Sequence, residues 1–299
     1  MSASLCGLAL LPGFCHPRAQ DRGTKMIAPN TSRLLSIAGD PKSELKDRIR
    51  ALTEMGQTGN REDAPQVRKL WDRKRPAQAP KPLDWDPDGA ERVVDQYIIL
   101  ALHQLGDDSL LPEIGGLVAQ AGRVLRGPDA ELGNAAKVIR AVGQASLIHQ
   151  LTELSASPKA PVAANAVRTL QLIKLPSPAS GGPLDSFPGL ARPVSFTIHR
   201  LREEVETIVT LSDGRIVLSD GVKDWIAKSD YERGEVQRKN TSLATVLTLE
   251  IDILDLTYAV TEQHVVICTF KEAGAHWQTW WMKFGHQLIW DPGKGEWHL

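Results

Sequence analysis

Two stretches of this chain align without a gap around a shared glycine, and this repetition constrains the fold more than any other feature. The first stretch, ALHQLGDDSLLPEIGGLV, begins at Ala101, and the second, VIRAVGQASLIHQLTEL, begins at Val138. Their glycines, Gly106 and Gly143, are 37 positions apart. Such a period, with helical spacing on both sides of a glycine turn, is typical of stacked helical hairpins that bury their apolar faces only against neighbouring units.

The apolar residues of the two stretches fall at the same positions relative to each glycine. These predicted core positions are Leu102, Leu105, Leu110, Leu111, Ile114 and Leu117 in the first stretch, and Ile139, Val142, Leu147, Ile148, Leu151 and Leu154 in the second. A third unit, AANAVRTLQLIKL, contributes one helix before Pro176. Two and a half units are fewer than the three or more that usually stand alone, so we expect other segments to cap both ends of the array.

The remaining segments divide the chain into regions of different character. Residues 1–40 are expected to be a leader or a disordered N-terminus, and two helices, from about Pro41 to Met55 and from about Asp63 to Arg73, precede the repeats. The helical domain is predicted to span residues 41–176. The stretch 177–193 is rich in Gly, Pro and Ser and is predicted to be a linker, followed by a second domain over residues 194–299.

Beyond the linker the apolar period changes from 3.6 to 2. VETIVTL and RIVLS flank the turn at Asp213-Gly214, and apolar residues alternate with polar ones from Leu247 to Ile253. Further strands are predicted at VVICTF, WQTWWMKF, QLIW and EWHL, with a short helix at GVKDWIAK. These segments indicate an antiparallel sheet, sandwich or barrel.

The pattern A-L-x-x-L-G-x-x-x-L-L-P-x-I, from Ala101 to Ile114, resembles a HEAT repeat, and its short period is similar to that of phycobilisome-lyase-type HEAT proteins. The resemblance covers residues 91–175 and implies a scaffold that binds other proteins. Some members of the family are metal-dependent hydroxylases with His-Glu pairs, but this chain contains no His-Glu dipeptide. The expected fold is therefore α+β, with a HEAT-like α-solenoid followed by an antiparallel β domain.

Composition limits the classes of partner. The net charge of −1 supplies no overall field for nucleic acid or an anionic membrane, and no apolar run is long enough to span a bilayer. Three cysteines give no disulfide framework, and Cys268 in VVICTF is expected to be a small buried hydrophobe. A cytoplasmic location is expected, with secretion or periplasmic export through the leader LCGLALLPGFC as the alternative.

One acidic segment has the spacing of a calcium-binding loop. In DWDPDGAERVVD, Asp84, Asp86, Asp88 and Asp95 occupy positions 1, 3, 5 and 12 of the pattern, where carboxylates can surround a hard cation. The sixth position holds glycine, as the pattern requires, whereas Arg92 stands at a ligand position. The favoured interpretation is that Asp88 caps the following helix and that Glu91 completes a capping box.

Tryptophans crowd the end of the chain. Five of the eight lie between Trp277 and Trp297. In a strand they would make both faces apolar, which indicates either a tryptophan core or an exposed aromatic surface for a sugar, a peptide or another flat ligand. The candidate ligand-binding residues are Trp277, Trp281, Trp290 and Trp297.

The function predicted from these observations is non-catalytic interaction with a protein partner, with no cofactor. Binding of a small molecule or carbohydrate by the tryptophans is the first alternative, and an enzyme of unidentified class is the second. The basic run RKLWDRKR is interpreted as a solvated helix end, because cations in a last turn oppose the helix dipole, so nucleic acid is not favoured. No nucleophile elbow, phosphate-binding glycine loop or dinucleotide fingerprint occurs.

Overall fold

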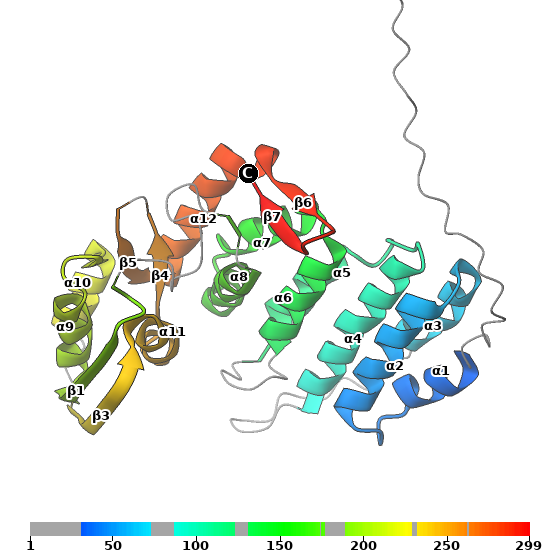
Figure 1. Ribbon diagram of the computed structural model, residues 1–299, viewed down its shortest axis with the longest axis horizontal. Helices are drawn as coiled ribbons and strands as arrows, with labels where there is room; N and C mark the ends of the chain where they lie inside the picture. The colour runs from blue at the N-terminus through cyan, green and yellow to red at the C-terminus, as the bar shows by residue number, and fades with distance from the viewer. Residues whose placement is uncertain are drawn as a thin grey trace, which may run out of the picture.

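A computed structural model describes residues 31–72, 87–122, 131–173, 175–176, 189–228, 232–261 and 263–299. The protein has a mixed α+β fold, as the sequence predicts. A helical part lies at one end of the molecule and a part that mixes helices with short strands lies at the other, with one long helix between them (Figure 1). Among the described residues no helix is both long enough and apolar enough to cross a membrane.

The helices of the first part pack in two layers. They are α1 (Thr31–Gly39), α2 (Leu45–Thr58), α3 (Ala64–Trp71), α4 (Pro87–Gln104), α5 (Glu113–Gln120), α6 (Glu131–Val142), α7 (Ala145–Leu154) and α8 (Ala160–Ile173), with a short 3-10 turn, η1 (Arg61–Asp63), before α3. Helices α2, α4, α6 and α8 contact one another in succession, and the first three are seen side by side in Figure 1. Helices α5 and α7 contact each other in the second layer.

The predicted core positions of the two aligned stretches are buried. Every one of them is buried except Leu154, which is half-buried. Gly106 and Gly143 both adopt the left-handed backbone conformation, with φ of 87° and 66°. That conformation favours glycine because it has no Cβ. The two glycines therefore end α4 and α6 in the same way, and after each glycine the chain turns into the second layer.

The N-terminal boundary differs from the prediction. Residues 31–39 form helix α1, inside the segment 1–40 for which a leader or a disordered N-terminus was expected. The next helix begins at Leu45 rather than Pro41, because Asp40 accepts a hydrogen bond from the Lys42 amide (2.9 Å) in a turn that follows α1. The following helix, α3, lies within the predicted helix at residues 63–73, of which residue 73 is outside the described residues.

The second part alternates helices and strands instead of forming an all-antiparallel β domain. Its elements are β1 (Pro193–Arg200), α9 (Leu201–Leu211), β2 (Ile216–Leu218), α10 (Asp220–Lys228), β3 (Glu232–Ser242), α11 (Leu243–Ile253), β4 (Leu256–Val260), β5 (Val265–Thr269), α12 (Phe270–Phe284), η3 (Gly285–Gln287), β6 (Ile289–Asp291) and β7 (Glu296–His298). Strands β1 and β3 pair antiparallel, β5 lies between β2 and β4, and β6 pairs with β7. The β2–β5 pair is parallel, which overturns the antiparallel prediction for this sheet.

Helix α11 shows why the strand predictions failed. The predicted alternation from Leu247 to Ile253 lies inside this helix. Its buried residues include Leu243, Leu247 and Ile251, which recur every fourth position and form one helical face. VETIVTL is likewise helical, in α9, where Val205 and Ile208 are buried. The strands predicted at RIVLS, VVICTF, QLIW and EWHL are present, as is the helix at GVKDWIAK.

The segment WQTWWMKF is part of helix α12 rather than a strand. Trp277, Trp280, Trp281 and Phe284 follow one another at intervals of three, one and three residues, which places them on one helical face. The helix begins with a capping box, in which the Thr269 hydroxyl accepts from the Glu272 amide and the Glu272 carboxylate accepts from the Thr269 amide. Local sequence thus starts a helix where apolar alternation predicted a strand.

Glu272 also joins α12 to the neighbouring helix α10. Its carboxylate accepts hydrogen bonds from the Ser219 hydroxyl (2.8 Å) and from the Gly221 amide (3.2 Å). Burial opposes ionisation of Glu272, but these bonds and those from Thr269 outweigh it and lower the pKa of the carboxyl. A charged, hydrogen-bonded Glu272 therefore fixes the start of α12 at the sheet.

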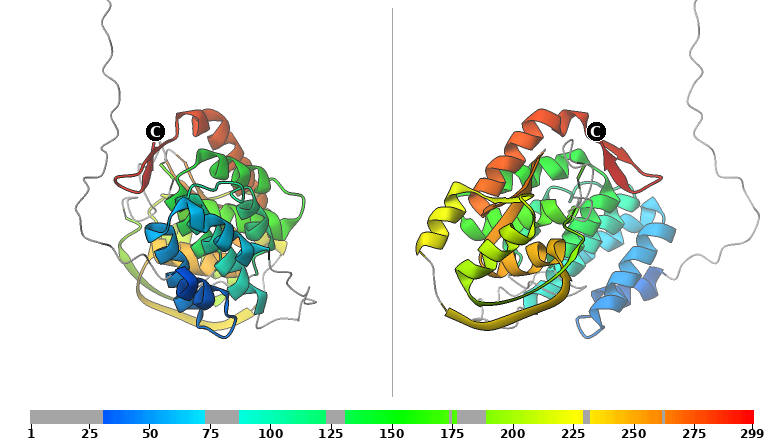
Figure 2. Two further views of the ribbon diagram at one scale, coloured as in Figure 1. Left: turned by 90° about the vertical axis from the view of Figure 1, so that its right-hand side faces the viewer. Right: turned by 60° about the vertical axis from the view of Figure 1, so that its left-hand side comes forward.

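Helix α12 connects the two parts of the molecule. It contacts α7 and α8, and Figure 2 shows it passing over these helices toward the C-terminal hairpin. Trp280, Leu288 and Trp297 belong to the same apolar cluster as the cores of α1 to α8. A separate cluster fills the second part, between α9, α10, α11 and the central sheet. Residues 177–188 of the predicted linker lie outside the described residues, and the domain boundaries stay a prediction.

Candidate functional site

A shallow groove of about 330 Å³ lies where the loop between α4 and α5 meets helix α7. Leu111, Pro112 and Leu147 supply its apolar lining. Polar side chains provide the rest: Asp108, Gln144, Ser146, His149, Gln150 and Glu153. The groove thus spans both aligned stretches, because its residues come from the segments that follow Gly106 and Gly143. We consider it the best candidate for a functional site in the described part of the chain.

The loop on one side of the groove is held by its own acidic residues. The Asp107 carboxylate accepts hydrogen bonds from the Ser109 hydroxyl (2.6 Å) and from the Ser109 amide (3.0 Å), and these bonds lower its pKa. Arg68 of α3 donates to the Ser109 hydroxyl and lies 4.0 Å from the Asp107 carboxylate. The first residue of the basic run RKLWDRKR therefore tethers α3 to this loop.

Asp108 links the loop to the next unit. Its Oδ1 lies 2.6 Å from Nδ1 of His103 at the end of α4, and its Oδ2 accepts a hydrogen bond from the side-chain Nε2 of Gln144 (3.2 Å). Further along α7, the side-chain Nε2 of Gln150 donates to the backbone carbonyl of Pro112 (2.7 Å). These contacts fix two side chains of the second stretch against the backbone and the carboxylate of the first. The groove is therefore preorganised by hydrogen bonds on both sides.

Helix α7 is also in contact with the C-terminal segment. The carbonyl of Gly274 in α12 accepts from the Ser155 hydroxyl (3.4 Å) beyond the end of α7. In the middle of α7 the imidazole of His149 stacks on the indole of Trp281, with ring centroids 5.0 Å apart and 17° between the planes. Helix α12 thus supports His149, whose imidazole is part of the groove wall.

The start of α7 is covered by the β6–β7 hairpin. The indole of Trp290 lies against Gly143, where any Cβ would overlap it. Trp290 and Trp297 are cross-strand neighbours with ring centroids 5.1 Å apart. Glycine at position 143 is thus needed for close packing as well as for its backbone conformation.

The four tryptophans singled out by sequence come from helix α12 and from the β6–β7 hairpin. Trp277 packs edge-on against Trp280, with ring centroids 5.6 Å apart, and Trp281 stacks on His149. Trp297 is buried, with 6% of its surface exposed, and Trp290 is half-buried. Each of these rings packs against the apolar clusters of the helices. Sequence analysis found the aromatic segment but missed its partners on α7, because His149 carries no local motif.

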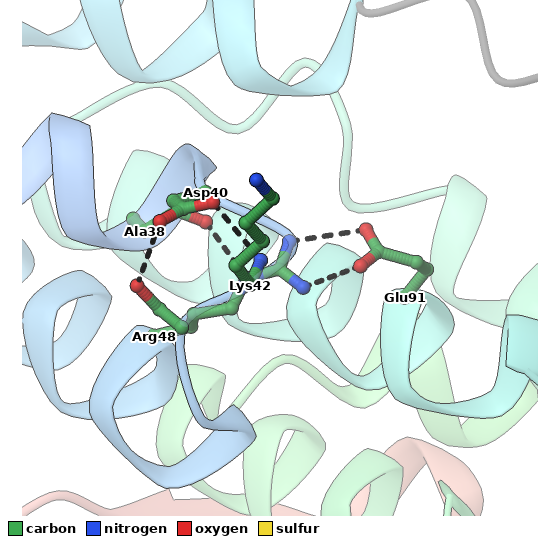
Figure 3. Close-up of polar contacts among 6 residues, drawn as sticks. Ala38, Asp40, Lys42, Arg48 and Glu91 are labelled. Atoms are coloured by element: carbon green, nitrogen blue, oxygen red, sulfur yellow. Dashed lines mark hydrogen bonds and ion pairs between the residues drawn. The ribbon is translucent and has the colours of Figure 1, made fainter.

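A row of ion pairs crosses the first helical layer and was also missed by sequence analysis. Figure 3 shows Arg48 of α2 bound to the Glu91 carboxylate of α4 and to the carbonyl of Ala38 at the end of α1. The neighbouring Arg92 pairs with Glu131 of α6 through two hydrogen bonds of 2.7 and 2.9 Å. Buried charges of this kind are costly unless paired, so these contacts fix how adjacent helices align.

The ion pairs bear on the predicted calcium-binding residues. Asp84 and Asp86 lie outside the described residues. Asp88 and Asp95 both belong to α4, seven positions apart, which separates them by about 10 Å along the helix axis. Helix α4 starts at Pro87, so Asp88 lies inside its first turn and not before it as a cap, and Glu91 pairs with Arg48.

The described part of the chain contains neither a metal-binding cluster nor a reactive thiol. No cluster of three or more His, Cys, Asp and Glu side chains there could hold a metal ion. Cys268 is buried as expected, and burial together with the nearby Glu272 carboxylate raises the pKa of its thiol to about 12. The thiol is therefore protonated and shielded from solvent, which is the opposite of what a nucleophile requires. What the groove can offer is a set of hydrogen-bond acceptors, donors and carboxylates open to solvent.

Comparison of the chain with protein-family models, with curated proteins and with solved structures gives no match.

Proposed function

We propose that this protein is a non-catalytic protein-binding protein, built on a short HEAT-like solenoid whose exposed groove between the α4–α5 loop and helix α7 receives the partner. The observation that carries the proposal is that the groove is formed by equivalent segments of two successive units. In a stacked array, loops and helices repeated at a fixed period present an extended surface that suits another protein.

The packing of α12 supports a solenoid that is closed within the chain. Helix α8 is the unpaired helix of the third unit, and α12 packs beside α7 and against α8, where the second helix of that unit would stand. An incomplete array needs such a cover, because its last apolar face is otherwise left in water. On this proposal the C-terminal segment is a cap of the solenoid.

The form of the groove favours a protein over a small molecule. Small-molecule sites enclose most of the ligand surface and are lined mainly by apolar side chains. Here Asp108, Ser146 and Glu153 are exposed, and the apolar lining is limited to three side chains. The tryptophans proposed for carbohydrate binding instead pack against helices, which makes that alternative less favoured.

Affinity capture with a groove variant tests the proposal. Ser146→Arg places a long charged side chain in the groove at an exposed position, and Gln57→Arg introduces the same residue at an exposed position on α2. We expect proteins cross-linked to the wild type in cell extract to be retained by Gln57→Arg and lost from Ser146→Arg. The proposal is wrong if both variants capture the same proteins as the wild type, at the same yields, while remaining folded by circular dichroism.

A further inference from the structure

The groove carries acidic groups at both ends and no basic side chain other than His149. Asp108 lies beside the start of α7, and Glu153 lies near its end. Asp108 Oδ1 lies 2.6 Å from Nδ1 of His103, and Glu153 Oε1 lies 3.8 Å from Nε2 of His149. The Asp108 and Glu153 side chains are nevertheless 56% and 70% exposed, so a partner can reach both carboxylates. No lysine or arginine is among the groove residues. The electrostatic field of the groove therefore favours cations.

The side-chain amides of the groove add hydrogen-bond acceptors to the two carboxylates, so the groove also favours partners that donate hydrogen bonds. Gln144 and Gln150 use their Nε2 groups to bind Asp108 and the Pro112 carbonyl. Each side-chain carbonyl is thereby oriented while keeping its own capacity to accept. Backbone amides of an extended segment and the ammonium or guanidinium groups of its side chains are the donors that fit such a surface.

The length of the groove sets the spacing of the partner's charges. Gln144, which binds Asp108, and Glu153 are nine positions apart on α7 and its cap, or about 13 Å along the helix axis. An extended chain covers that distance in about four residues. Stacking of His149 on Trp281 fixes the wall between the two acidic ends.

We propose that the groove binds an extended segment of a partner protein that carries lysine or arginine at two positions about four residues apart, one on Asp108 and one on Glu153. This inference rests on the proposed protein-binding function and names the chemistry of its partner. Because both carboxylates are largely exposed, each pair adds only a modest gain in affinity, and the binding weakens as salt concentration rises.

Fluorescence polarisation with two labelled peptides tests the inference. The probe GKTVTKG has the predicted spacing, and GETVTEG is its acidic counterpart. We expect saturable binding of the first and none of the second. Glu153→Lys should weaken the binding of GKTVTKG roughly fivefold, the effect of one exposed pair. Glu54→Lys makes the same charge change at an exposed position of α2 and should leave the affinity unchanged.

Three results would overturn the inference. These are equal binding of the two peptides, equal weakening by Glu153→Lys and Glu54→Lys, and absence of binding by GKTVTKG at millimolar concentration. A change of oligomeric state caused by Glu153→Lys in sedimentation would assign the groove to a second copy of the chain instead. If GKTVTKG does not bind but Ser146→Arg still abolishes the capture of proteins from extract, only the basic character of the partner is rejected. If the peptide does not bind and Ser146→Arg has no effect on capture, the protein-binding function is rejected as well.

Discussion

At the scale of single residues, identical positions in two repeats carry different constraints. Gly106 and Gly143 occupy the same slot and have similar backbone conformations. Nothing lies within 4 Å of a Cβ placed on Gly106, whereas a Cβ on Gly143 meets the Trp290 indole. Sequence alignment of the repeats predicts the turn at both glycines, but the second constraint comes from a residue far along the chain.

Replacing each glycine by alanine should separate the cost of the left-handed backbone conformation from the cost of displacing the Trp290 indole. Gly106→Ala is expected to lower the free energy of unfolding by about 1 kcal/mol, the cost of a left-handed non-glycine residue. Gly143→Ala should lower it further, because the new methyl group displaces Trp290. Urea denaturation followed by circular dichroism measures both. In a Trp290→Ala background the two costs should converge, and a persistent difference would show that the indole is not responsible.

At the scale of elements, paired charges decide how neighbouring helices align. Arg92 and Glu131 have side chains only 13% and 6% exposed, and their two hydrogen bonds hold α4 against α6. The pairs Lys46–Glu44 and Lys223–Asp220 lie in solvent and impose no comparable constraint. Sequence patterns show the charges, yet burial alone distinguishes the two kinds of pair.

Breaking the buried pair from one side should be strongly destabilising. Glu131→Gln removes the carboxylate of Glu131 from its buried pair with Arg92 and is expected to lower the free energy of unfolding by about 3 kcal/mol. The double variant Arg92→Met, Glu131→Leu should recover most of that loss, because neither charge then remains buried. Lys223→Ala, which breaks an exposed pair, serves as the control for denaturation. Equal effects of Glu131→Gln and Lys223→Ala would contradict a structural role for the ion-pair row.

At the scale of the whole molecule, α12 makes the end of the chain part of the helical core. Trp280 is buried among residues of the first part, although more than a hundred positions separate it from α7 and α8. Met282, two positions further on, is 74% exposed. In a strand, residues two positions apart would share a face, whereas the helical geometry of α12 separates these two side chains.

Truncation of Trp280 should therefore loosen the distant helices. Trp280→Ala is expected to cost about 3 to 5 kcal/mol of stability by leaving a large cavity, whereas Met282→Ala should cost little. Hydrogen exchange of backbone amides in α7 and α8 should accelerate in the first variant and not in the second. Unchanged exchange in α7 and α8 of Trp280→Ala would mean that the C-terminal segment and the helical array are energetically independent.

The sequence by itself determined the features that depend on local order along the chain. The spacing around Gly106 and Gly143 predicted the core positions of both repeats, and the apolar setting of Cys268 predicted its burial. Such patterns suffice because the spacing of apolar residues within one segment indicates which side of a helix or strand is buried. The predicted strands over α9, α11 and α12 failed because short apolar runs satisfy both periods until their neighbours are known.

Only the tertiary structure decided the groove and the path of the C-terminal segment. Asp108 meets Gln144 across 36 positions, Arg92 meets Glu131 across 39, and Trp281 reaches His149 from another part of the chain. None of these pairs follows from a motif, since each partner is an ordinary polar or aromatic residue in its own segment. The physical reason is that an apolar helix face must be buried against another segment, and which segment covers it depends on packing, not on local sequence.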